Sequence, residues 1–255
     1  MIVKRLETVP EIESHRQVRL KECGHIFEIM SRDHHGHGEP TTIKISADEY
    51  IDTRSGEIKQ FNHQTSRADN LQSVSRSLAL GRDMLNANID DVANCRWLTL
   101  TYAENMTDPK KLMFDFGNFN KRCRQRFGHY EYITAAEPQG RGAWHLHCVL
   151  IFPTKAPYMA NDVVADLWKH GFVTVKRLDD VDNVGAYLTA YLGDMELSEA
   201  TAQGIHGEVK TVDYEENGEQ KSKRYIKGAR MHMYPVGFNI FRYSKGCKKP
   251  VVSYT

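Results

Sequence analysis

The sequence predicts an α+β fold in which an antiparallel sheet carries helices on one face, with extensions at both ends of this core. Between residues 96 and 193, segments rich in β-forming residues alternate with segments whose apolar residues recur at helical spacing. The chain has 255 residues, of which 40% are hydrophobic and 26% charged. Such a chain is long enough to bury a sizeable core and has the composition of an ordinary globular protein.

The expected elements of the core follow one another in the order strand, helix, strand, strand, helix, strand. The strands are expected at residues 96–102, 130–136, 143–152 and 172–177. The first helix begins at Thr107-Asp108-Pro109 and ends at Gly128, and the second spans residues 161–169. This order is that of a ferredoxin-like sheet. A further helix is expected from Asp182 to Gly193, because a capping residue precedes its apolar stripe and a glycine ends it.

Three regions are expected along the chain. Residues 1–90 form an N-terminal extension with mixed strands and a basic amphipathic helix at 70–88, and residues 91–200 form the core. Residues 201–255 are an acidic linker followed by a basic C-terminal extension, since no acid follows Glu219. Charge alone leaves two interpretations of this basic segment open, contact with a polyanion or a solvated surface.

The sequence also indicates the compartment. It contains no apolar run long enough to span a bilayer, and its N-terminus lacks the apolar core of a signal peptide. Five cysteines are scattered without Cys-x-x-Cys spacing, which favours free thiols in a reducing environment. We therefore expect a cytoplasmic protein with no membrane contact.

Two histidines within the expected strand 143–152 are the first candidate functional residues. Side chains alternate along a strand, so His145 and His147 project from one face while Leu146 projects from the other. Glu137 leaves the preceding strand just before the hairpin turn. Two imidazoles and a carboxylate would make a three-ligand site for Mn²⁺, Mg²⁺ or Zn²⁺ with positions left open for a substrate. The other interpretation is a pair of core histidines with a surface glutamate.

Two tyrosines on the expected helix 182–193 are the second candidate. Tyr187 and Tyr191 are four residues apart and therefore share one helix face. Aromatic pairs at this spacing are usually part of a core. Here a separate apolar stripe already exists, which places the tyrosines at its edge.

These residues together resemble the ordered motifs of the HUH endonucleases, and more specifically the two-tyrosine rolling-circle replication initiators (Rep proteins) of bacterial phages, plasmids and integrated elements. The resemblance covers about residues 70–250. It rests on Trp97-Leu-Thr-Leu-Thr-Tyr102, on the strand bearing His145-Leu-His147, and on Tyr187-x-x-x-Tyr191. Single-tyrosine members often carry a lysine three residues after the tyrosine, and Ala190 at that position favours the two-tyrosine type.

The resemblance implies a site-specific single-stranded DNA endonuclease and ligase that initiates rolling-circle replication. Glu137, His145 and His147 would hold the divalent metal, Mn²⁺ or Mg²⁺ with Zn²⁺ possible, and Tyr187 or Tyr191 would attack the DNA. The product would be a 5′-phosphotyrosine link and a free 3′-hydroxyl. The expected partners are single-stranded DNA at an origin hairpin, a host helicase and a DNA polymerase.

Cationic and aromatic residues are the candidates for holding this DNA. Tyr102 is an alternative to the tryptophan as a stacking platform for bases. The expected DNA-binding residues are Lys121, Arg122, Arg124, Arg126, Arg141, Trp144, Arg242, Lys245 and Lys248.

Two alternative functions remain open from sequence. An HUH transposase or conjugative relaxase would share the chemistry and differ in its DNA. A non-catalytic ferredoxin-like module that binds single-stranded nucleic acid would use the same aromatic and basic residues without the tyrosines.

Overall fold

The fold is organised around a five-stranded sheet with the strand order β13-β7-β8-β6-β9. The computed structural model describes residues 18–31, 40–61, 71–178, 193–216 and 219–254. The sheet consists of β6 (Cys95–Thr101), β7 (Glu131–Pro138), β8 (Trp144–Ile151), β9 (Val173–Lys176) and β13 (Phe241–Tyr243). All neighbouring pairs in it are antiparallel. Without β13, the order β7-β8-β6-β9 is that of a ferredoxin-like sheet, as the sequence predicts.

Two helices cover one face of this sheet, α2 (Pro109–Phe127) and α3 (Asn161–Trp168). The Asp108 side chain caps α2 by accepting a hydrogen bond from the backbone N–H of Lys110 at 2.7 Å. Phe119 of α2 and Trp168 of α3 are fully buried against Leu146 and other side chains from the same face of the sheet. Leu146 therefore faces these helices, and the two histidines beside it in sequence face away from them.

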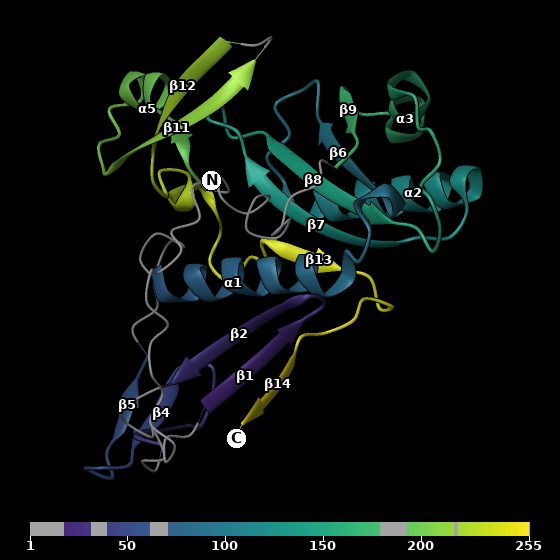
Figure 1. Cartoon of the computed structure of the whole chain (residues 1–255). Helices are drawn as coiled ribbons and strands as arrows, with labels where there is room; N and C mark the ends of the chain where they lie inside the picture. The colour runs from purple at the N-terminus through teal and green to yellow at the C-terminus, as the bar shows by residue number, and fades with distance from the viewer. Residues whose placement is uncertain (1–17, 32–39, 62–70, 179–192, 217–218, 255) are drawn as a thin grey trace.

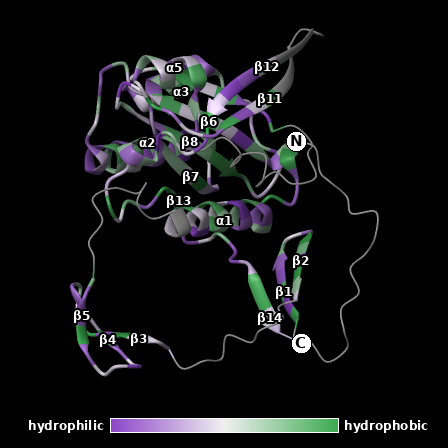
Figure 2. Ribbon diagram, turned by 90° about the vertical axis from the view of Figure 1, so that its left-hand side faces the viewer, coloured by the Kyte–Doolittle hydropathy of each residue, from purple (hydrophilic) through white to green (hydrophobic). Residues whose placement is uncertain are grey.

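A third helix, α1 (Leu71–Asn88), covers part of the opposite face. Met84 and Leu85 of α1 pack with Ile133 of β7 and Val149 of β8. Figure 1 shows α1 running beneath β7 and β13, with a smaller sheet on its other side, and Figure 2 shows the same layering from the side. The expected arrangement of helices on one face holds for the core helices, and α1 from the N-terminal extension adds a layer on the other face.

The N-terminal and C-terminal extensions meet in one small sheet. Strand β14 (Val251–Tyr254) pairs with β1 (Val18–Cys23), which pairs in turn with β2 (Ile26–Ser31). A second small sheet contains β3 (Thr42–Lys44), β4 (Glu49–Asp52) and β5 (Ile58–Gln60). A third contains β10 (Met195–Glu196), β11 (Val209–Glu216) and β12 (Glu219–Ile226), next to the short helix α5 (Leu197–Ala202).

Several expectations from sequence can be compared directly with this fold. The four core strands, the two core helices and the helix at 70–88 lie where the sequence predicts them, within a few residues. The helix expected over residues 182–193 lies outside the described residues except for its end at Gly193. All five cysteines are free and buried, as expected for thiols that form no disulfides. Within the described ranges, no helix is both long and apolar enough to cross a membrane.

Close packing between α1 and β13 requires glycine at position 81. A Cβ atom at Gly81 would overlap the ring of Phe241. Replacing glycine by alanine inside a helix normally stabilises a protein by about 0.5–1 kcal/mol. We expect Gly81→Ala instead to lower the free energy of unfolding by about 1–3 kcal/mol, because the ring or the helix must move.

Gly117 of α2 provides the matched control, since a Cβ there would meet no described atom within 4 Å. Gly117→Ala should raise the free energy of unfolding, measured by urea denaturation. The double variant with Phe241→Leu should recover part of the loss at position 81. A stabilising Gly81→Ala would show that α1 does not pack on β13 as described.

Candidate active site

The register of the central sheet brings Glu137, His145 and His147 onto one face. Glu137 of β7 lies directly opposite His145 of β8. His147 lies between Thr99 of β6 and Ala135 of β7. Directly opposite residues of an antiparallel pair project to the same side of the sheet. The carboxylate and both imidazoles therefore share the face that α2 and α3 leave uncovered, which the sequence pattern predicts.

Glu137 is the most connected residue of this group. Its Oε2 atom lies 3.1 Å from Nε2 of His147, and its Oε1 atom lies 2.8 Å from Nη1 of Arg230. The backbone N–H of Gly193 also donates to Oε1, at 3.4 Å. Burial alone would raise the pKa of the Glu137 carboxyl, but the His147 hydrogen bond and the Arg230 charge outweigh it and lower that pKa. Glu137 is therefore a carboxylate, the form that binds a cation.

His145 has a free ring nitrogen in a buried place. Its Nε2 atom is shielded from solvent and has no hydrogen-bond partner among the described residues. Burial, followed by the nearby His147, lowers the pKa of His145 to about 4, so the ring is neutral at pH 7. A neutral imidazole nitrogen without a partner is costly to bury unless it serves a ligand. This unsatisfied atom is what a metal ligand would present before the metal binds.

The second imidazole is held in place by its neighbours. Thr99 Oγ1 lies 3.3 Å from His147 Nδ1, and the indole of Trp97 stacks on the same ring with centroids 5.4 Å apart. Across the described part of the chain, no three His, Cys, Asp or Glu side chains already stand as a preformed metal-binding group. The donor set and the unpartnered Nε2 of His145 nevertheless fit a divalent cation that completes the site on binding.

The predicted nucleophiles, Tyr187 and Tyr191, lie outside the described residues. The described chain resumes at Gly193, two residues after Tyr191. The backbone N–H of Gly193 is hydrogen-bonded to Glu137. The segment that carries both tyrosines thus ends at the carboxylate of the candidate site.

The basic residues of α2 do not lie on this face. The helix covers the opposite side of the sheet, where Arg122 Nε donates to the carbonyl oxygen of Leu167 at 2.8 Å. Arg124 Nη2 similarly donates to the carbonyl oxygen of Tyr130 at 2.7 Å. Lys121 and Arg126 are exposed on the same helix. We therefore remove all four residues from the set expected to hold DNA over the histidines.

The two aromatic residues expected to stack on bases are buried, and that expectation is corrected here. Trp144 is 2% exposed, stacks on Phe238 at 4.8 Å and donates its indole N–H to the carbonyl oxygen of Thr107. Tyr102 is 3% exposed and donates its hydroxyl to Asp115 at 2.8 Å. Both rings are part of the core.

The remaining expected DNA contacts are divided between two ends of the β7–β8 hairpin. Arg141 lies in the hairpin turn between Glu137 and His145, where its Nη2 donates to the carbonyl oxygen of Tyr102 at 3.0 Å. Arg242 lies opposite Thr134, on the face that carries α2. Lys245 and Lys248 lie near the start of β7, at the far end of the hairpin. Only Arg141 is placed close to the histidines.

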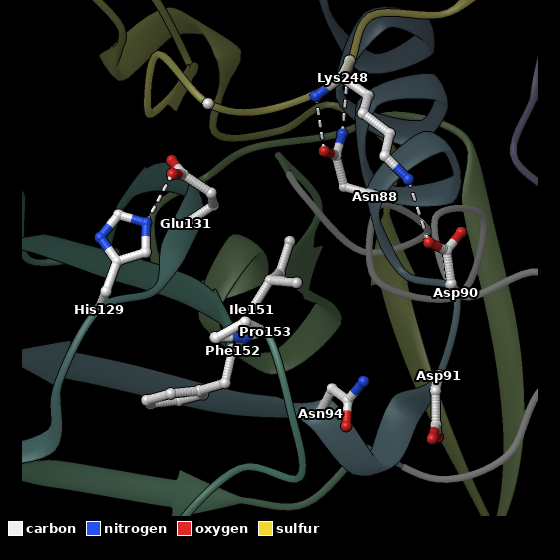
Figure 3. Close-up of a pocket in the computed structure, with 11 residues that line it drawn as sticks. Asn88, Asp90, Asp91, Asn94, His129, Glu131, Ile151, Phe152, Pro153 and Lys248 are labelled. Atoms are coloured by element: carbon white, nitrogen blue, oxygen red, sulfur yellow. Dashed lines mark hydrogen bonds and ion pairs between the residues drawn. The ribbon is translucent and has the colours of Figure 1, made fainter.

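A surface cavity of about 280 Å³ lies at this far end, between the start of β7 and the end of β8. Figure 3 shows that Lys248 is bound to Asn88 and Asp90, and that His129 is bound to Glu131. Most charged groups in the cavity are acidic. The cavity is therefore unsuited to a phosphate backbone and separate from the histidine face.

The sequence analysis missed three residues that belong to the histidine face. Trp97 and Lys176 lie opposite each other on β6 and β9, on the side of the sheet that carries His147. Alternation along β6 would have placed Trp97 there once its register with β8 was known. Arg230 is 93 residues from Glu137 in sequence, and no local pattern links the two.

Comparison with known proteins agrees with this placement. Searches of curated proteins and of solved structures each found no match. Residues 95–196 match a family described as Replication-associated protein, of the ORF2 type. This range begins at the first residue of β6 and ends with β10, so it contains the ferredoxin-like sheet and all the candidate catalytic residues. Over this range the chain is similar to that family of replication-associated proteins, which supports a role in the initiation of DNA replication.

Proposed function

We propose that the chain is a metal-dependent enzyme that nicks and rejoins single-stranded DNA at an origin of replication, through a covalent link to Tyr187 or Tyr191. The observation that carries the proposal is the convergence of Glu137, His145 and His147 on the open face of the sheet, with the buried Nε2 of His145 unpartnered. The similarity of residues 95–196 to replication-associated proteins supports the same conclusion.

The protein residues prepare the site before DNA arrives. Glu137 is ionised and His145 is neutral, which are the protonation states that bind a divalent cation, Mn²⁺ or Mg²⁺ and less typically Zn²⁺. Thr99 and Trp97 hold the His147 ring, and Arg230 holds the carboxylate. A bound cation would polarise a non-bridging oxygen of the scissile phosphate.

The chemical step is an exchange of one phosphodiester for another. A tyrosine oxygen forms a bond to the scissile phosphorus as its hydroxyl proton is lost, and the bond from phosphorus to the 3′-oxygen breaks. The 3′-oxygen leaves with a proton as a free hydroxyl, while the 5′-phosphate remains on the tyrosine. The reverse reaction with a 3′-hydroxyl rejoins the strand. Two tyrosines would allow one cleavage to follow another before the first link is resolved.

The DNA would cross the open face between the hairpin turn and the β9 edge. Lys176 is exposed at that edge, and Arg141 lies in the turn. Trp97 is half-buried against His147 and offers an indole surface between them. A cationic track with one aromatic platform is what single-stranded DNA requires. We further propose a hairpin origin as substrate, a host helicase and DNA polymerase as partners, and action in the cytoplasm.

Cleavage of single-stranded oligonucleotides tests the proposal. The oligonucleotides would tile both strands of the DNA that carries this gene, each incubated with protein and Mn²⁺. We expect one sequence to be nicked, with a 3′ end that a DNA polymerase extends and a 5′ end that polynucleotide kinase cannot label. Chelation of the metal, or annealing of the complementary strand over the site, should each suppress the nick. Binding of these oligonucleotides without any nick would instead indicate a non-catalytic nucleic-acid-binding module.

A further inference from the structure

We propose that Arg230 is a positioning residue of this site, which orients Glu137 toward the imidazoles and ties it to the end of the tyrosine-bearing segment. This inference rests on the proposed function and names a residue that the function does not itself require. Arg230 follows β12, far from the core strands in sequence. Its side chain is nevertheless only 19% exposed and lies beside Glu137.

The guanidinium group of Arg230 joins two carboxylates. Its Nη1 lies 2.8 Å from Oε1 of Glu137, and its Nη2 lies 3.0 Å from Oε2 of Glu199 on α5. A guanidinium is planar and presents its donors in a fixed geometry, so each carboxylate restricts the direction of the other. Without this cation, two carboxylates would lie close together in a partly buried place, and one of them would tend to take up a proton.

The backbone of Arg230 makes a second connection. Its N–H donates to the carbonyl oxygen of Gly193 at 2.9 Å, and the Gly193 N–H donates to Oε1 of Glu137 at 3.4 Å. Arg230, Gly193 and Glu137 therefore form a closed triangle in which each residue is bonded to the other two. Gly193 has a φ of +85°, and a Cβ there would overlap the Met231 side chain. Glycine is required at this corner.

The second carboxylate extends the connection to the hairpin turn. Gln203, which follows α5, donates through Nε2 to the carbonyl oxygen of Gly140 at 3.2 Å. Gly140 lies in the turn between Glu137 and His145, and a Cβ there would overlap Glu199. The side of α5 thus rests on the turn that separates the candidate ligands. Arg230 holds α5 to Glu137 across that contact.

This arrangement divides the work of the two Glu137 oxygens. Oε1 is occupied by Arg230 and Gly193, whereas Oε2 is directed to His147. A carboxylate fixed in this way keeps one oxygen on the side of the imidazoles and cannot rotate both oxygens away. Loss of such an orienting partner typically lowers metal affinity or activity by about 10–100-fold.

Mn²⁺ affinity is the direct test, because it can be measured by calorimetry without any nicking. Arg230→Gln should weaken Mn²⁺ binding by about tenfold or more, since the orienting cation is lost. Arg230→Lys keeps the charge but not the planar pair of donors, and should bind Mn²⁺ more tightly than Arg230→Gln and more weakly than wild type. Arg54→Gln makes the same chemical change in the exposed β4–β5 turn and should leave Mn²⁺ binding unchanged. Thermal melting would confirm that each variant is folded.

The nicking reaction separates positioning from DNA contact. If Arg230 acts through Glu137, the variants should lower kcat while the dissociation constant for the oligonucleotide changes by less than about twofold. An Mn²⁺ affinity of Arg230→Gln within twofold of wild type would overturn the inference, and so would a loss of oligonucleotide affinity without a loss of metal affinity. Failure of the wild type itself to bind any divalent metal would overturn the proposed function as well.

Discussion

Replacing both Tyr187 and Tyr191 by phenylalanine is expected to abolish covalent attachment of the protein to DNA, a loss on the order of 10³-fold or more because the nucleophile itself is removed. Phenylalanine retains the ring and loses only the hydroxyl. Mn²⁺ and oligonucleotide binding should therefore remain close to wild type. The measurement is the yield of an SDS-resistant protein–DNA adduct over time.

Single tyrosine variants would show how the two hydroxyls divide the reaction. If either tyrosine can attack, each single variant should retain an adduct, and only the double variant should lose it. Tyr158, which is 87% exposed and lies outside the site, provides the matched control as Tyr158→Phe. An undiminished adduct from the double variant would show that another group is the nucleophile.

Replacing His145 by leucine is expected to eliminate metal binding while leaving the metal-free protein at least as stable. The buried Nε2 of His145 has no partner in the described structure, so wild type bears the cost of desolvating it. A buried polar group without a hydrogen bond costs about 1–3 kcal/mol, and leucine removes that cost at similar volume. The increase in melting temperature that Mn²⁺ causes in wild type should be absent from His145→Leu.

The pH dependence of stability provides a second check on the same variant. The pKa of His145 is about 4 in the folded protein, against an ordinary value of 6.5. Between these values the unfolded chain binds the proton and the folded chain does not, so this residue makes stability fall as the pH drops from 6.5 to 4. His145→Leu should flatten that part of the profile. His129→Leu, an exposed site at the far end of the hairpin, is the control.

If His145→Leu destabilised the metal-free protein by several kcal/mol, the imidazole would be a packing residue of the core. If it retained the Mn²⁺-induced rise in melting temperature, His145 would not be a metal ligand. Either result would restore the interpretation of the two histidines as ordinary core residues.

Alternation along single strands accounts for what the sequence predicts well. The spacing of His145 and His147 places them on one face whatever the rest of the fold does, and the turn after Glu137 returns the chain beside it. The same rule places Trp144 on the face of Leu146, which is the helix-covered side. The burial of Trp144 could thus have been anticipated, and its proposed role as a base platform conflicted with the pattern that identified the histidines.

Contacts between distant segments account for what the sequence leaves out. The basic side of α2 is visible from its spacing, but whether that side adjoins the histidine face depends on which face of the sheet the helix covers. Arg230 reaches Glu137 only because a C-terminal turn packs against the sheet, and β14 joins β1 across almost the whole chain. No local periodicity carries this information.

Identification of the residue that bears the nucleotide tests the central claim most directly. The adduct formed with Mn²⁺ and a cleaved oligonucleotide would be digested with nuclease and trypsin and analysed by mass spectrometry. The proposed function predicts a nucleotide joined through its 5′-phosphate to Tyr187 or Tyr191, and no such peptide from Glu137→Gln prepared in parallel. A nucleotide on any other residue, or efficient nicking without a covalent adduct, would contradict it.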